Sequence, residues 1–102
     1  MKQEHILIVE DEPSILYTLK EALLLSDYQV STAQTLEEAK KSLSSNLDLI
    51  LLDLNLPDGQ GFSFCETVCS ANRIPVIILT ALDEDTDIIR GLDLGADDYV
   101  TK

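Results

Sequence analysis

Basic side chains are scarce in this sequence of 102 residues: seven lysines and arginines stand against 19 aspartates and glutamates, which gives a formal net charge of -12. Nucleic acids and anionic membranes are recognised through basic surfaces, so direct binding to either is not expected. Glycine and proline are also few, with four and three residues, while 45% of the residues are hydrophobic. These proportions argue against a disordered chain and predict one domain with a real core.

Long apolar runs and metal-binding cysteine pairs are lacking as well. No run approaches the roughly 18 apolar residues of a membrane helix, and the first residues do not have the pattern of a secretory signal, which predicts a cytoplasmic protein. Cys65 and Cys69 are four residues apart in a stretch with a helical pattern, and only one histidine accompanies them, so they are interpreted as packing residues. That histidine, His5, is expected to face solvent just before a strand.

Three short segments are almost entirely aliphatic, at residues 6–9, 49–52 and 76–79. Such runs without alternation are typical of strands that are buried on both faces of a parallel sheet. Weaker strand patterns at residues 29–33 and 98–101 bring the expected number of strands to five.

Helical patterns separate these strands. Pro13 suits the first turn of a helix that should end near residue 26. Its expected apolar stripe is Ile15, Leu19, Ala22 and Leu23. Thr35 and Glu38 have the spacing of a capping box and predict the start of a second helix. Third and fourth helices are expected at about residues 60–71 and 85–94.

Strict alternation of strands and helices predicts an α/β fold with a doubly wound parallel sheet, in which ligands bind at the carboxyl ends of the strands. The polar residues expected at that edge are Glu10, Asp11, Asp53, Thr80 and Lys102. Carboxylates ~4 Å apart repel each other by roughly 4 kcal/mol at an effective dielectric constant of ~20. Mg²⁺ is the simplest compensation, because it binds one or two carboxylates, keeps several waters and leaves room for a phosphate.

The segments "ILIVEDEP", "DLILLDLNLPDGQGF", "PVIILTA" and "GLDLGADDYVTK" together resemble the receiver domain of bacterial two-component response regulators. The last two segments most resemble the subfamily that carries a winged-helix DNA-binding output domain. The resemblance covers residues 1–102 and implies a flavodoxin-like, five-stranded parallel sheet with strand order 2-1-3-4-5. It also implies a signalling switch rather than an enzyme, controlling transcription through a separate output domain.

The resemblance assigns roles to individual residues around the phosphate. Asp53 matches the aspartate that accepts a phosphoryl group from a sensor histidine kinase. Glu10 and Asp11 match the acidic pair that holds Mg²⁺, with Asp11 a direct ligand and Glu10 acting through water. Asn55 matches the position whose backbone carbonyl binds the metal, and Lys102 matches the amine that neutralises phosphoryl oxygens.

Further positions match the family's switch and contact residues. Thr80 matches the hydroxyl that turns toward the phosphate, and Tyr99 matches the aromatic residue that follows it. Asp97 and Asp98, with Arg90 as a basic counterpart, match contacts across a homodimer built from the fourth helix and the fifth strand. The family continues past the position of Lys102 with a fifth helix and often an output domain, so a truncated receiver with an incomplete dimer surface is expected.

Three other functions were weighed against this interpretation. A phosphohydrolase of the haloacid dehalogenase type needs a second aspartate two residues after the nucleophile, where this chain has Asn55. A nucleotide or flavin binder needs glycines after the first strand, where "VEDEPS" offers acids instead. A degenerate receiver used only for protein contacts is disfavoured, because every polar position of the family's site is filled.

Overall fold

The computed structural model describes residues 4–43, 46–53, 55–56, 59–60, 64, 68, 74–80 and 98–101. The helices expected at residues 60–71 and 85–94 lie almost entirely outside these ranges. The strands and the first two helices are described in full, and they are the elements that position the candidate site.

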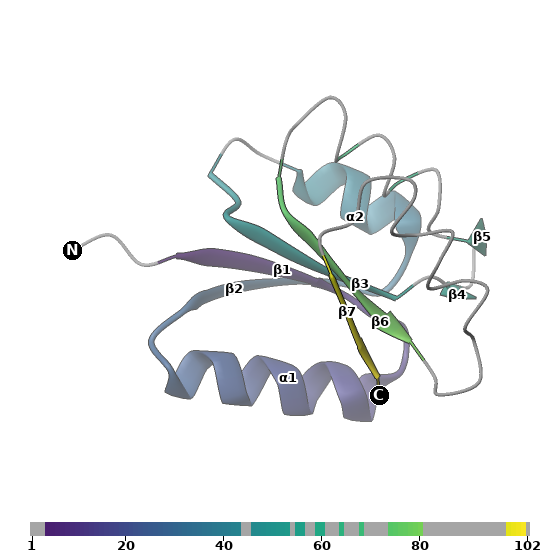
Figure 1. Cartoon of the computed structure of the whole chain (residues 1–102). Coiled ribbons are helices and arrows are strands. Elements are labelled where there is room, and N and C mark those ends of the chain that lie inside the picture. Colours follow the sequence, from purple (N-terminus) through teal and green to yellow (C-terminus); the bar gives the residue numbers. More distant parts are fainter. Residues whose placement is uncertain are drawn as a thin grey trace.

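Parallel strands form the main sheet, in the order β2-β1-β3-β6-β7 (Figure 1). Their bounds are β1 His5–Val9, β2 Gln29–Ala33, β3 Leu49–Asp53, β6 Val76–Thr80 and β7 Asp98–Thr101. The first strand therefore lies inside the sheet, and the chain crosses over it to continue on the other side. This arrangement confirms the predicted flavodoxin-like α/β fold, in which the strand order reverses between β1 and β3.

Two helices cover opposite faces of this sheet (Figure 1). Helix α1, Pro13–Leu25, begins with the predicted proline in its first turn. Helix α2, Leu36–Ser42, begins at Thr35, whose Oγ1 accepts a hydrogen bond from the Glu38 backbone N–H at 3.1 Å. The predicted helix start is therefore confirmed, since this bond satisfies a backbone donor that the helix itself leaves unpaired. The Glu38 carboxylate accepts from the Thr35 hydroxyl at 3.3 Å, whereas in a full capping box it would accept from the Thr35 backbone N–H.

The buried stripe of α1 differs from the prediction at two residues, Leu16 and Ala22. Leu16 is the buried position of this helix, and Ile15, Leu19 and Leu23 are half-buried beside it. Ala22 was predicted to face the sheet but is exposed. At about 100° per residue, Ala22 falls at the margin of a stripe that is centred between Leu16 and Leu19.

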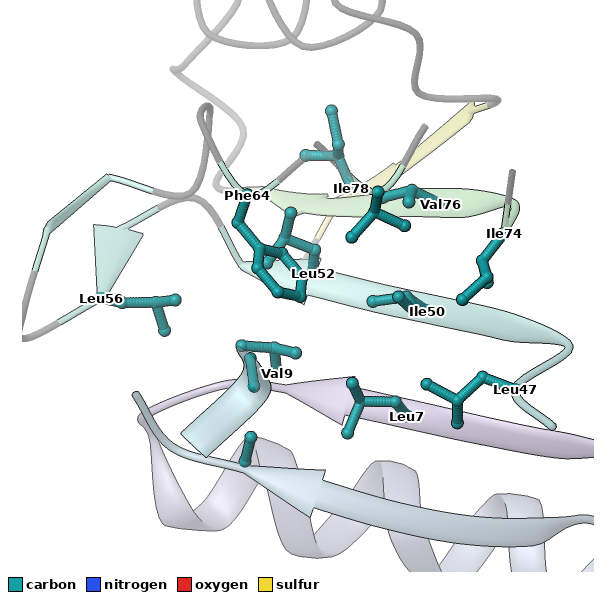
Figure 2. Packing of buried hydrophobic residues seen from close by; sticks show 13 residues of the cluster. Leu7, Val9, Leu47, Ile50, Leu52, Leu56, Phe64, Ile74, Val76 and Ile78 are labelled. Atoms are coloured by element: carbon teal, nitrogen blue, oxygen red, sulfur yellow. The ribbon is translucent and has the colours of Figure 1, made fainter. Parts of the chain in front are cut away.

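The hydrophobic core lies on the α2 side of the sheet (Figure 2). Alternate residues of the central strands enter it, and all of these are buried. They are Leu7, Val9, Ile50, Leu52, Val76 and Ile78. Ala39 of α2 completes the layer from above, and Leu56, Phe64 and Val68 extend it.

The α1 side of the sheet is covered less completely. Ile6 and Ile8 of β1 are buried, at 4% and 0% exposure, because α1 packs on β1 and β2. Leu49, Leu51 and Ile77, which have the opposite parity to the core residues of β3 and β6, are only half-buried. The central part of this face therefore has weaker cover than the face under α2.

A small hairpin follows β3 directly. Strands β4, Asn55–Leu56, and β5, Gly59–Gln60, pair antiparallel, with Asn55 opposite Gln60 and Leu56 opposite Gly59. The sequence analysis did not predict it. Leu56 is buried in the core, so the hairpin is attached to the body of the domain.

His5 corrects another prediction, because it does not precede the first strand but begins it, and it is half-buried. Its Nε2 lies 2.6 Å from Ser31 Oγ of β2, and its backbone N–H donates to Asp48 Oδ2 at 2.8 Å. Ser31 offers the ring a hydrogen-bond partner, which solvent was expected to provide. Among the described helices, neither is long and apolar enough to cross a membrane.

Candidate metal centre

Three carboxylates meet at the carboxyl ends of two neighbouring strands. Val9 of β1 pairs with Leu52 of β3, so Glu10 and Asp53, one residue further along, leave the sheet at the same level. Asp11 follows Glu10. Each of the three acids has a carboxylate oxygen that lies within 4.8 Å of a carboxylate oxygen of each of the other two.

The acids differ in exposure and in how they are held. Glu10 is fully buried and Asp53 is 3% exposed, whereas Asp11 is exposed. The Glu10 backbone N–H donates to the Ala33 carbonyl at 3.0 Å, which fixes the exit of the chain from β1. The Glu12 backbone N–H donates to Glu10 Oε2 at 3.2 Å, so the start of α1 holds this carboxylate in place.

The donor set fits a hard divalent cation. Its atoms are all carboxylate oxygens, which Mg²⁺ prefers, and the exposed position of Asp11 leaves one side open to water. Ionised carboxylates so close together are unfavourable near a core unless positive charge or hydrogen bonds compensate them. Glu10, Asp11 and Asp53, which the sequence places at one edge of the sheet, lie together there and could hold such an ion.

Other predicted residues are described through their backbone alone. Asn55 begins β4, two residues after Asp53. Thr80 is the last residue of β6, one position beyond the pair formed by Asp53 and Leu79, so its backbone reaches the same edge of the sheet. Tyr99 belongs to β7.

Asp98 is the first residue of β7. Arg90, Asp97 and Lys102 lie outside the described residues. The roles assigned to these residues remain predictions. The structure adds the Glu12 backbone N–H as a contributor to the site, which no sequence pattern could have shown, because every residue except proline carries the same donor.

The chain belongs to the response regulator receiver domain family, whose model matches residues 6–102. This assignment agrees with the resemblance noted in the sequence and with the sheet and acidic cluster described above. The family makes the chain part of a signalling system.

Similar curated proteins are transcriptional regulators. The chain is 46% identical over 99 residues to the alkaline phosphatase synthesis transcriptional regulatory protein PhoP of Bacillus subtilis, with 95% of this chain and 41% of that protein covered. It is 42% identical over 99 residues to the KDP operon transcriptional regulatory protein KdpE of Escherichia coli, with 96% and 44% covered. The chain thus spans less than half the length of these relatives.

Solved structures share the fold. A two-component response regulator from Clostridium difficile superimposes with a TM-score of 0.90 at 33% identity, covering 98% of this chain and 84% of that one. The non-phosphorylated HemR receiver domain from Leptospira biflexa gives a TM-score of 0.88 at 39% identity, with 98% and 82% covered.

Proposed function

We propose that this chain is the phospho-accepting receiver of a two-component system and that Asp53 is its phosphorylation site. The observation that carries the proposal is the position of Asp53 at the end of β3, nearly buried, with its carboxylate beside those of Glu10 and Asp11. Phosphoryl transfer asks a protein mainly for positioning and charge neutralisation. The strand ends would position the acceptor carboxylate, and a Mg²⁺ ion held by the acids would supply the positive charge.

The reaction we propose is a simple displacement. An oxygen of the Asp53 carboxylate attacks the phosphorus of a phosphohistidine on a sensor histidine kinase, so that an O–P bond forms and the P–N bond breaks. Glu10, Asp11, Asp53 and the backbone carbonyl of Asn55 would hold Mg²⁺, Glu10 through water, and the bound ion would offset negative charge on the phosphoryl oxygens. Lys102 contributes an ammonium group to the same oxygens.

The phosphorylated state would be passed on through the neighbouring strands. The Thr80 hydroxyl turns toward the phosphoryl group, Tyr99 fills the space that it leaves, and the surface near β7 changes as a result. Phosphorylation shifts such an equilibrium only by stabilising one state more than the other. Thr80→Ala should accept phosphate but lose the distant changes.

The output of this switch is proposed to be transcription regulation by a winged-helix domain in the cytoplasm. Names of similar proteins, such as the transcriptional regulators PhoP and KdpE, support this part. We also propose a homodimer contact in which Arg90 meets Asp97 and Asp98. In the complete fold, a fifth helix would cover the five-stranded sheet beside α1, where Leu49 and Leu51 are half-buried.

Acetyl phosphate tests the phosphorylation site without a kinase. In the presence of Mg²⁺, the intact mass of the wild-type chain should increase by one phosphoryl group, and Asp53→Asn should abolish the increase. Asp48→Asn is the matched control, because Asp48 is an exposed acid just before the same strand, at its other end. Labelling that persists in Asp53→Asn, or that is lost in Asp48→Asn alone, would contradict the assignment.

A further inference from the structure

Gly59 occupies a backbone conformation that other residues rarely adopt. Its φ is +141°, in the region that L side chains avoid. A Cβ built at this position would lie 3.5 Å from Leu36 Cδ1, which is ordinary van der Waals distance, and Gly59 is exposed. The space therefore accepts a methyl group, and the backbone conformation is what requires glycine here.

The hairpin that contains Gly59 is held from two sides. Leu56, opposite Gly59, is 8% exposed in the core. Gly59 lies beside Leu36, the first residue of α2, since a Cβ built at Gly59 would be 3.5 Å from Leu36 Cδ1, and Leu36 packs against that core. The Thr35 cap fixes the start of α2, so Leu36 is a well-defined support for the hairpin.

The hairpin also controls where the chain goes after Asp53. Asn55 pairs with Gln60, directly beside the pair of Leu56 and Gly59, so a change in the backbone at Gly59 is transmitted to Asn55 through one pair. Asn55 is only two residues from Asp53, and its carbonyl is the fourth oxygen that we assign to the metal.

We propose that Gly59 is a positioning residue for the metal centre: its positive φ lets the hairpin rest on Leu36, and this contact sets the position of the Asn55 carbonyl. The inference rests on the proposed function, because it concerns the affinity of the same site. It assigns Gly59 no contact with metal or phosphate.

The test is the half-saturating Mg²⁺ concentration, measured by direct titration of the chain without a phosphodonor and, separately, from the rate of phosphorylation by acetyl phosphate. Gly59→Ala should raise this concentration roughly tenfold, the lower end of what outer-shell changes cost a metal site. D-Alanine favours positive φ, so a chain with D-alanine at position 59 should return to within about twofold of wild type. Residues 1–64 can be made synthetically and ligated to 65–102 at Cys65, and the wild-type chain is prepared in the same way.

Ala22→Gly controls for lost stability, because it weakens an exposed position of α1 far from the hairpin in sequence. It should leave the half-saturating Mg²⁺ concentration unchanged, since a small loss of stability hardly lowers the fraction of folded chains that can bind the ion. Leu36→Ala removes the side chain on which the hairpin is proposed to rest, so it should raise the half-saturating Mg²⁺ concentration as Gly59→Ala does. This second variant provides the test if Gly59→Ala does not fold.

Two results would overturn the inference. One is an unchanged half-saturating concentration in folded Gly59→Ala or, if that variant does not fold, in Leu36→Ala. The other is a D-alanine chain as impaired as the L-alanine chain, which would show that φ is not the cause. A wild-type chain that accepts no phosphate would instead contradict the proposed function, so the two failures are distinguishable.

Discussion

The three acids of the metal centre act against folding when no cation is present. Glu10 and Asp53 are buried, and Asp11 adds a third negative charge within 4.8 Å at the exposed side of the cluster. Unfolding separates these charges and returns them to water, so the folded chain bears a repulsion that the unfolded chain does not. Mg²⁺ that binds only the folded chain removes part of this cost and stabilises it by mass action.

Asp11→Asn should therefore have opposite effects with and without Mg²⁺. Without divalent ions, the free energy of unfolding should rise by roughly 1 kcal/mol, below the Coulomb value for a pair at ~4 Å because water screens an exposed group. With Mg²⁺ at millimolar concentration, the stabilisation seen in wild type should shrink. Urea unfolding followed by circular dichroism measures both quantities.

Glu21→Gln is the control for this prediction, because it removes one acid from an exposed position of α1. Its unfolding free energy should stay within about 0.5 kcal/mol of wild type, as is usual for surface changes. Mg²⁺ that stabilises Asp11→Asn as strongly as the wild-type chain would show that Asp11 is not a ligand.

At this scale, the sequence predicted the acids but not what holds them. Glu10, Asp11 and Asp53 could be placed together because each follows an aliphatic run and the ends of parallel strands share one edge. The hydrogen bond from the Glu12 backbone to Glu10 depends on the path of the chain into α1, which residue types do not encode. The contact of His5 with Ser31 was missed for a similar reason, since it requires the register of β1 and β2.

The end of helix α1 is fixed by backbone hydrogen bonds and by one residue with a positive φ. After α1, the Asp27 N–H donates to the Leu24 carbonyl and the Tyr28 N–H to the Leu23 carbonyl, both at 3.1 Å. These are the two bonds of a Schellman motif, with Asp27 at φ +67° in the position where glycine is usual. An aspartate there carries a backbone penalty, and its negative charge faces the negative end of the helix dipole.

Asp27→Gly should raise the free energy of unfolding by about 1 kcal/mol, through relief of the backbone and of the dipole. Asp27→Asn removes only the charge and keeps a side chain that tolerates this conformation, so it should give a few tenths of a kcal/mol. Thermal and urea unfolding of the three chains measure the two increments. A loss of stability in both variants would show that a contact of the Asp27 carboxylate outweighs these terms.

Long elements with periodic patterns were predictable, and very short ones were not. Thr35 and Glu38 marked the start of α2, and Pro13 marked the start of α1, because capping and the missing proline N–H act locally. The hairpin at Asn55–Leu56 and Gly59–Gln60 has strands of two residues, which are too short for any hydrophobic period. Its position is tied to the burial of Leu56 and to the place of Gly59 beside Leu36 of α2, and both depend on residues distant in sequence.

Across the whole molecule, the two faces of the sheet are unequally covered. Ile50 and Leu52 are fully buried under α2, while Leu49 and Leu51 of the same strand, and Ile77 of β6, remain half-buried on the α1 side. The unbroken aliphatic run of β3 predicted a strand buried on both faces, so the sequence did not show that one face would have weaker cover. The half-buried side chains belong to β3 and β6 because α1 packs on β1 and β2. The sequence does not show where α1 packs.

This uneven cover should be visible in solution. Leu49, Leu51 and Ile77 are already half-buried, so full cover would add for each less than about half of the ~1.5 to 3 kcal/mol that complete burial is worth, a sum that still matters beside the ~5 to 15 kcal/mol by which domains are stable. We expect the 102-residue chain to associate, as measured by light scattering, or to bind a hydrophobic dye as an easily melted monomer. Leu51→Gln should reduce the association or, if the chain is a monomer, the binding of the dye.

Leu25→Gln is the matched control, because Leu25 lies on α1 and is 84% exposed. This substitution should change neither association nor dye binding. A stable monomer of 102 residues that binds no dye would contradict the prediction. It would mean that α1 and the half-buried leucines already exclude enough water from this face.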